Sequence, residues 1–354
     1  MLYQAPNPHG GGRYGRRVAL DFSVNTNPLG TPDRVRQAAA DSLRHMDRYP
    51  DPCCQELTQA IAQHERVPAD YVLCGGGAAE LIFSYCAALR PGRCLELAPT
   101  FSEYAAAAEA AGGEMERFPL RQEGQFVLGE EFLDHLERGG WDAVFLCNPN
   151  NPTGQLIPRP LLEEIAQVCH RKGMGLFLDE CFLDLSDGGE GDGLKERLSK
   201  QPGLFILKAF TKSFGMAGLR LGYGLCGDRA LLGAMSRTVQ PWNVSLPAQA
   251  AGVAALGEGE FLEKARALIQ EERGWLRARL EAMGLWVCPS QANYLLLYSP
   301  RPLFDPLLER GVLVRSCANY CGLGEGWYRV AVKRREENRM LVEALAEVLE
   351  DSFS

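Results

Sequence analysis

Short apolar runs alternate with amphipathic stretches between about residues 70 and 226. The runs that predict β-strands are 71–74, 94–97, 143–147, 176–178, 205–207 and 221–226. Apolar positions at helical spacing lie between them, at 78–89, 104–111 and 159–172. Nearly continuous apolar strands separated by helices are typical of a mostly parallel sheet covered on both faces. We therefore predict a large α/β domain with three layers over residues 45–250.

The pattern changes after residue 246, where a long charged amphipathic helix is predicted at 258–283. Further strands are predicted at 285–288, 293–298, 312–315 and 327–332, with helices at 303–310 and 336–349. This order indicates a smaller α+β domain, built from residues 1–44 and 251–354. The stretch 187–193, with four glycines and three acids, is expected to be a flexible loop.

Composition narrows the class of protein. Of the 354 residues, 46% are hydrophobic and 23% are charged, which is ordinary for a globular chain. The net charge of −8 argues against nucleic acid or an anionic membrane surface as the partner. No secretory pattern opens the chain and no apolar run has the length of a bilayer, so we expect a cytoplasmic protein.

Twelve cysteines raise the question of disulfides or a metal centre. Their spacings include no C-x-x-C pair, and Cys317 and Cys321 have no second Cys or His pair near them in sequence. We therefore expect no metal site. Four cysteines fall in or beside apolar runs and are predicted to be small buried hydrophobes: Cys74, Cys147, Cys181 and Cys226.

The strongest chemical pattern lies in residues 209–223. Lys212 directly follows an apolar strand, and Arg220 stands eight residues later between two glycines. A buried lysine can attack an aldehyde, and an arginine is suited to a phosphate. A surface lysine and an ion-paired arginine are the alternative, which the flanking glycines make less attractive because they allow a ligand to approach the backbone.

Three more segments place polar groups at predicted strand ends. The glycine-rich turn at 74–80 leads into a helix, where backbone N–H groups bind anions. Asn151 lies in the turn that ends another strand, and Asp179 follows the strand at 176–178. An amide can bond a ring oxygen, and a carboxylate can pair with a protonated ring nitrogen. Taken singly, each segment is explained equally well as a tight turn or a helix cap.

These four segments, in this order, resemble the fold-type I, class I/II aminotransferase superfamily, whose members bind pyridoxal 5'-phosphate. The resemblance implies that Lys212 forms the Schiff base and moves protons at the substrate Cα. It implies that Asp179 keeps the ring nitrogen protonated. The other implied cofactor contacts are Gly77, Ala78, Ala79, Thr211 and Arg220 at the phosphate, Asn151 at the phenolate oxygen, Phe101 on the ring, and Phe182.

The chain departs from the superfamily pattern at two places. Ala209 stands where a phosphate-binding serine is frequent, and Phe182 replaces a tyrosine that often bonds the ring oxygen. Asn151 would then make that bond alone. Tyr49 matches a tyrosine that reaches the phosphate of the neighbouring subunit. The resemblance thus implies a homodimer with composite active sites.

The two ends of the chain resemble the threonine-phosphate decarboxylases of cobalamin biosynthesis, whose relatives are the histidinol-phosphate aminotransferases. The matching stretches are 9–12, 20–30 and 314–338. In the decarboxylases the segment after the first stretch closes over the substrate, and here it is shorter. The resemblance implies a small phosphorylated amino acid as substrate, bound by His9, Gly10, Asn27, Arg315 and Arg329.

The reaction depends on which Cα bond stands perpendicular to the cofactor ring, because the electrons of that bond flow into the ring. If the arginines hold the carboxylate there, CO₂ leaves, and we predict conversion of L-threonine O-3-phosphate to (R)-1-aminopropan-2-yl phosphate. The alternative is transamination of histidinol phosphate or a related amino acid. The alternative interpretation of Arg315 is that it forms an ion pair on the surface and does not bind substrate. A binding module without activity is a further alternative, which the retained Lys212 and Asp179 disfavour.

Overall fold

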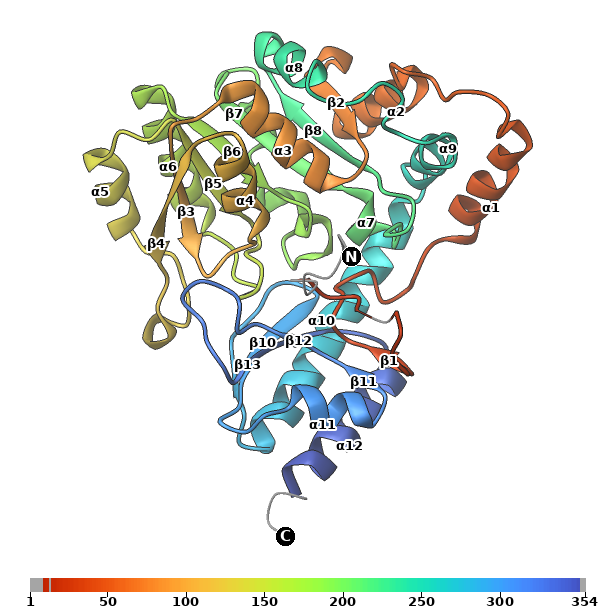
Figure 1. Cartoon of the computed structure of the whole chain (residues 1–354), viewed down its shortest axis with the longest axis vertical. Coiled ribbons are helices and arrows are strands. Elements are labelled where there is room, and N and C mark those ends of the chain that lie inside the picture. Colours follow the sequence, from red (N-terminus) through yellow and green to blue (C-terminus); the bar gives the residue numbers. More distant parts are fainter. Residues whose placement is uncertain (1–8, 13, 351–354) are drawn as a thin grey trace.

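A seven-stranded sheet organises the larger part of the computed structural model, which describes residues 9–12 and 14–350 (Figure 1). In spatial order its strands are β2 (Val72–Gly75), β8 (Gly222–Cys226), β7 (Leu204–Ala209), β6 (Gly175–Asp179), β5 (Ala143–Cys147), β3 (Arg93–Ala98) and β4 (Glu114–Pro119). β8 runs opposite to the other six strands, which are parallel to one another. The predicted mostly parallel α/β sheet is confirmed.

The strands are apolar throughout because each face of the sheet packs against helices. Along β5, Val144 and Leu146 enter one hydrophobic core, while Phe145 and Cys147 enter the other. This alternation follows from the two-residue period of a strand. One face carries α3 (Ala78–Leu89), α4 (Glu103–Ala110) and α8 (Arg229–Ser236); the other carries α2 (Gln55–Glu65), α5 (Glu131–Arg138), α6 (Arg159–Lys172) and α9 (Leu246–Ala255).

The strand β4 was not predicted from the sequence. It lies at the edge of the sheet and pairs only with β3 among the described strands. Glu114, Glu116 and Arg117 on it are exposed, so the segment lacks the continuous apolar run of its buried neighbours. Charged side chains on an edge strand also discourage pairing with another molecule.

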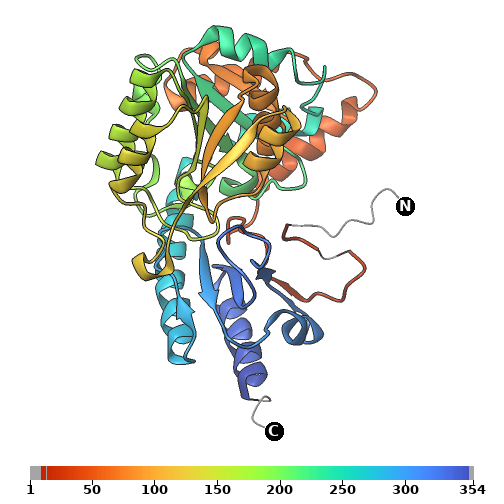
Figure 2. The same cartoon turned by 60° about the vertical axis from the view of Figure 1, so that its left-hand side comes forward.

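The smaller part of the molecule contains a four-stranded antiparallel sheet, as the predicted α+β region requires (Figure 2). Its strands are β12 (Arg315–Ser316), β13 (Trp327–Ala331), β10 (Tyr294–Tyr298) and β9 (Trp286–Val287). Three helices accompany it, α10 (Gly259–Ala282), α11 (Phe304–Glu309) and α12 (Arg335–Glu350). Their apolar side chains form a separate core that includes Leu276, Leu295 and Leu341.

The N-terminal segment contacts both parts. Its strand β1 (Leu20–Asp21) pairs with β11 (Val312–Leu313) of the small part. Helix α1 (Asp33–Ser42) instead lies against α9 of the large part. The division of the chain at residues 45 and 250 stays a proposal, and residues 20–42 form a connection between the two sides.

The remaining elements are short. Lys212 lies in α7 (Phe210–Ser213), a single turn after β7. The loop predicted at 187–193 contains one turn of 3-10 helix. The 3-10 turns are η1 (Leu43–His45), η2 (Ala69–Tyr71), η3 (Gln122–Gly124), η4 (Leu183–Leu185), η5 (Gly189–Asp192) and η6 (Lys195–Arg197). Within residues 9–12 and 14–350, no helix combines the length and apolarity needed to cross a membrane.

Candidate active site

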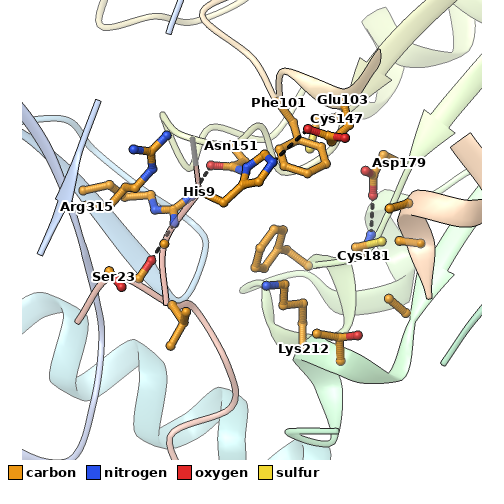
Figure 3. A pocket seen from close by; sticks show the side chains of 18 of the residues that line it. His9, Ser23, Phe101, Glu103, Cys147, Asn151, Asp179, Cys181, Lys212 and Arg315 are labelled. Atoms are coloured by element: carbon orange, nitrogen blue, oxygen red, sulfur yellow. Dashed lines mark hydrogen bonds and ion pairs between the residues drawn. The ribbon is translucent and has the colours of Figure 1, made fainter. Parts of the chain in front are cut away.

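A cavity of about 470 Å³ opens where the carboxyl ends of the parallel strands meet the small domain (Figure 3). Such a volume suits a cofactor or a small metabolite. Ligands in open α/β sheets bind at this edge. Thirteen residues predicted to belong to the site line it: His9, Gly10, Ala78, Ala79, Phe101, Asn151, Asp179, Phe182, Thr211, Lys212, Arg220, Arg315 and Arg329.

Lys212 extends into the middle of this cavity, with Asp179 and Arg315 on opposite sides (Figure 3). Its Nζ lies 5.3 Å from the centre of the Phe182 ring. Burial, followed by the charge of Arg329, lowers the pKa of Lys212 to about 8. About a tenth of the side chains are then neutral at pH 7. The amine is therefore able to act as a nucleophile and as a proton carrier at neutral pH.

Asp179 is held at the end of β6 by two donors. Its Oδ2 accepts a hydrogen bond from the hydroxyl of Tyr104 at 2.6 Å, and its Oδ1 accepts one from the backbone N–H of Cys181 at 2.9 Å. Burial raises the pKa of Asp179, while these two bonds act in the opposite direction. A buried carboxylate of this kind favours a cationic partner. A protonated ring nitrogen meets that requirement.

Tyr104 was missed by sequence reasoning. It is fully buried in the first turn of α4, three residues after Phe101. The bond to Asp179 joins positions 75 residues apart, so only the fold brings them together. The available hint was a tyrosine three residues after an expected ring-stacking residue.

Arg220 and Gly77 form a close-fitting corner for an anion. A Cβ added at Gly77 would lie 2.5 Å from Nη2 of Arg220, so this approach needs glycine, whose φ is +102°. Arg220 itself has a φ of +58°, a conformation that costs a non-glycine residue about 1–3 kcal/mol. Ala78 and Ala79 begin α3 beside this corner and line the cavity, which adds the backbone N–H groups of a helix start.

Two arginines meet at the other side of the cavity. Arg315 and Arg329 are directly opposite one another in the register of β12 and β13. They are 9% and 6% exposed, so Arg315 is not the surface ion pair that the sequence left open. Like charges directly across a strand pair destabilise it. An anionic ligand between the guanidinium groups removes that cost.

Neutral oxygens accept hydrogen bonds from both arginine side chains. Arg315 donates to Asn319 Oδ1 at 2.7 Å. Arg329 donates to Asn151 Oδ1 and, at 2.9 Å, to the carbonyl oxygen of Ser23. With the Asn25 amide turned so that its oxygen faces Arg329, it accepts from Nε at 3.0 Å. These partners orient the guanidinium of Arg329 without neutralising it.

The N-terminal glycine segment covers the rim of the cavity. His9 Nε2 lies 2.9 Å from Glu103 Oε1 on α4 (Figure 3). Gly11 donates its backbone N–H to Ser23 Oγ at 2.8 Å. A Cβ at Gly10 would stand 2.2 Å from the carbonyl oxygen of Ser23, so only glycine fits there. Glu103 had not been predicted as part of the site.

Three predicted site residues are not among those that line the cavity. Gly77 stands directly behind Arg220. Asn27 is 3% exposed and its side chain bonds to the backbone beside Lys212. Tyr49 is 78% exposed and stacks on Trp242 with ring centres 4.5 Å apart.

Seven lining residues had not been assigned to the site. They are Ser23, Val24, Glu103, Cys147, Cys181, Ala209 and Tyr320. Cys147 and Cys181 were predicted only as buried hydrophobes, and their burial is confirmed. Burial is also the main cause that raises the pKa of both thiols, which keeps them neutral.

The lining groups fit pyridoxal phosphate. Lys212 supplies a buried amine of lowered pKa for its aldehyde, and Asp179 supplies a carboxylate for its ring nitrogen. Arg220, with the start of α3, supplies positive charge and N–H donors for its phosphate. Asn151 accepts from Arg329 through its oxygen, which turns its amide nitrogen toward other acceptors.

Comparisons with known proteins agree with this fit. Residues 17–345 match the family described as aminotransferase class I and II. The chain is 39% identical to a threonine-phosphate decarboxylase of Salmonella typhimurium, over 93% of this chain and 91% of that protein. It is 35% identical to a histidinol-phosphate aminotransferase of Desulfitobacterium hafniense, over 94% and 92%.

Among solved structures, the histidinol-phosphate aminotransferase of Clostridium acetobutylicum superposes with a TM-score of 0.87 at 26% identity, covering 94% of this chain and 99% of that one. The predicted fold and cofactor are therefore confirmed. The chain belongs to the class I and II aminotransferase family and is a pyridoxal-phosphate-dependent enzyme.

Proposed function

We propose that this enzyme decarboxylates L-threonine O-3-phosphate to (R)-1-aminopropan-2-yl phosphate. The observation that carries the proposal is the pair of buried arginines, Arg315 and Arg329, which lie directly across from one another on β12 and β13 and both line the cavity. The substrate carries two anionic groups, a carboxylate and a phosphate. Two forked cations in one pocket suit such a molecule.

The cofactor would be held by residues of the large domain. Lys212 would bind its aldehyde, Asp179 its ring nitrogen and Asn151 its phenolate oxygen, while Phe101 stacks on its ring. The phosphate would lie against Thr211, Arg220 and residues 77–79. Bound in this way, pyridoxal phosphate acts as an electron sink for the bond that breaks at Cα.

The residues of the chain then decide the course of the reaction. Arg329, fixed by Asn151 and Ser23, orients the substrate carboxylate. The loss of CO₂ leaves an electron pair at Cα, and Lys212 returns one proton to that atom. The net change is release of one CO₂ and uptake of one proton. His9 and Gly10 cover the substrate and exclude water from this centre.

The similarity to the Salmonella decarboxylase supports this reaction. We also propose that the enzyme takes part in cobalamin biosynthesis. We also propose a cytoplasmic homodimer with composite sites. The exposed stacked pair of Tyr49 and Trp242 supports the dimer, because exposed aromatic side chains are typical of protein interfaces. In that dimer Tyr49 would reach the partner's cofactor phosphate.

Transamination of histidinol phosphate is the second candidate. The 35% identity to the Desulfitobacterium aminotransferase and the likeness to the Clostridium structure favour it. The same cavity would serve, with Cα–H placed where decarboxylation needs the carboxylate. Lys212 would then carry the proton away from Cα.

A product assay separates the two reactions. The loaded enzyme is incubated with L-threonine O-3-phosphate, and CO₂ and keto acid are both measured. The proposal expects one CO₂ for each substrate consumed and no keto acid. A parallel incubation uses histidinol phosphate with 2-oxoglutarate. Formation of glutamate there, without CO₂ release from threonine phosphate, would replace the decarboxylase proposal by the aminotransferase.

A further inference from the structure

One stretch, residues 23–27, in which every second residue is buried, touches both the arginine and the lysine of the site. At its start, the carbonyl oxygen of Ser23 accepts from Arg329 Nη2 at 2.9 Å. At its end, the backbone N–H of Asn27 donates to the carbonyl oxygen of Lys212 at 3.0 Å. Ser23, Asn25 and Asn27 are between 1% and 3% exposed. We call residues 23–27 the tie segment.

Asn27 makes a second bond to the Lys212 turn through its side chain. Its Nδ2 donates to the carbonyl oxygen of Ser213 at 2.8 Å. Its Oδ1 accepts from the backbone N–H of Leu29 at 2.9 Å, which fixes the orientation of the amide. Both ends of the Asn27 amide therefore bond backbone groups, the nitrogen to Ser213 and the oxygen to Leu29.

The tie segment is itself attached to the small domain. Phe22, just before it, donates to Leu313 O at 2.7 Å and accepts from Ala331 N at 2.9 Å. Within it, the carbonyl oxygen of Asn25 accepts from Asn293 Nδ2 at 3.1 Å. These bonds reach the strand of Arg329 and the segment before β10. The tie segment therefore moves with the sheet that carries the substrate-binding arginine.

The Lys212 turn has a separate anchor in the large domain. Ser213 Oγ donates to Asp184 Oδ2 at 2.9 Å, and Lys208 Nζ lies 3.0 Å from Asp184 Oδ1. Lys208 is 3% exposed and is also bonded to Glu65. The turn is therefore held on one side by β7 and Asp184, and on the other by Asn27.

We propose that Asn27 is a positioning residue, through which the tie segment sets where Arg329 stands relative to Lys212. This inference rests on the proposed use of these two residues and holds for either candidate reaction. Arg329 would direct an anionic group of the substrate, the carboxylate of threonine phosphate or the phosphate of histidinol phosphate, and Lys212 would serve Cα. Their separation therefore governs which Cα bond is aligned for cleavage, and a misplacement of about 1 Å changes rates by up to about a hundredfold.

The test compares Asn27→Ala with Thr31→Val. Thr31 is a matched control, because its hydroxyl donates to Gly215 O at 2.9 Å, three residues beyond Lys212 in the same region. Asn27→Ser provides a second variant, because serine can still bond Leu29 N–H but is too short to reach Ser213. Circular dichroism melting first verifies that each variant is folded.

Two readouts follow. The first is the ratio of keto acid to CO₂ formed from threonine phosphate, since histidinol phosphate has no carboxylate to lose. We expect Asn27→Ala to change this ratio by about tenfold or more, and Thr31→Val to leave it unchanged. The second readout needs no turnover. It is the pH midpoint of the visible absorbance of the cofactor-loaded enzyme, which should rise in Asn27→Ala as Lys212 moves away from Arg329.

A uniform loss of rate in Asn27→Ala and Asn27→Ser, with the product ratio and the absorbance midpoint as in the wild type, would reduce Asn27 to a structural role. If the wild type acts on neither substrate, the proposed function fails. In that case the pH midpoint of the absorbance still tests the role of Asn27. A shifted midpoint in the Asn27 variants, with an unchanged midpoint in Thr31→Val, supports the positioning role. An unchanged midpoint in the Asn27 variants overturns that role.

Discussion

The cofactor side and the substrate side of the cavity are built in different ways. On the cofactor side, Asn151, Asp179 and Lys212 each lie at or just after the end of a strand of one sheet, so the topology alone brings them together. On the substrate side, Arg315 and Arg329 from a second sheet meet the N-terminal segment. The cofactor side binds pyridoxal phosphate, which is the same in both candidate reactions, through local sequence motifs. The substrate side depends on contacts over about 300 residues, and it is where the two candidate reactions differ.

Removal of the Lys212 amine should lower activity more than any other change, because this amine would bind the cofactor and also carry a proton at the substrate Cα. Lys212→Ala should lower kcat by about 10⁴-fold or more, since nucleophile and proton carrier are lost together. Cofactor retained without a covalent bond would be detected by absorbance after denaturation. Turnover within tenfold of wild type would show that another group carries the proton.

Replacement of Arg329 should separate the two sides. Arg329→Lys keeps a charge but loses the fork, and Arg329→Ala loses both. We expect Arg329→Ala to raise KM by about a hundredfold, with Arg329→Lys intermediate, because a charged hydrogen-bonded contact in a buried site is lost. Cofactor affinity, measured by titration of the apoenzyme, should stay within about threefold. A parallel fall in cofactor affinity would contradict the separation.

The lowered pKa of Lys212, about 8, predicts how the apoenzyme captures its cofactor. Only the neutral amine reacts, so the rate of capture should rise about tenfold per pH unit below pH 8 and level off above it. Stopped-flow absorbance gives this profile. Burial is the first cause of the shift and Arg329 the second, so Arg329→Met should move the midpoint to higher pH. An unchanged midpoint would mean that the two sides are electrically independent.

Tyr104→Phe should affect the cofactor side alone. It removes the hydroxyl that donates to Asp179 at 2.6 Å. A hydrogen bond to a charged group contributes about 1.5–3 kcal/mol, so cofactor affinity should fall about tenfold or more. KM for the substrate, measured at saturating cofactor, should remain near the wild-type value. A change confined to KM would place Tyr104 on the substrate side instead.

The smallest effect is expected at Ala209, which lines the cavity where relatives in the superfamily frequently have serine. Ala209→Ser should add one hydrogen bond to the phosphate, contributing about 1 kcal/mol, or about fivefold in cofactor affinity. Ala209→Val, which adds bulk without a hydroxyl, is the control. Equal affinity in wild type and Ala209→Ser would place the phosphate away from residue 209.

The same contrast explains what could be predicted from the sequence. The strands β5 and β8 and the helix α3 could be predicted from unbroken apolar runs or from apolar positions at helical spacing. Once these elements are placed, the polar residues at their ends can be predicted as site residues. The bond between Tyr104 and Asp179 could not be predicted, since it joins two elements through the interior of the fold. Asn27 was expected to touch substrate, but its buried side-chain amide bonds the backbone of the Lys212 turn. This contact depends on how two distant backbone segments pack, which the sequence does not reveal.

The cross-strand arginine pair has a consequence for the lifetime of the protein. Arg315 and Arg329 place two like charges directly across a strand pair inside the small domain, and their mutual repulsion weakens the folded state. A ligand that relieves this repulsion binds the folded chain alone, so it raises the free energy of unfolding by mass action. Resistance of the small domain to proteolysis should then follow the supply of its own substrate, and abundance of the enzyme would adjust to demand without any change in its synthesis.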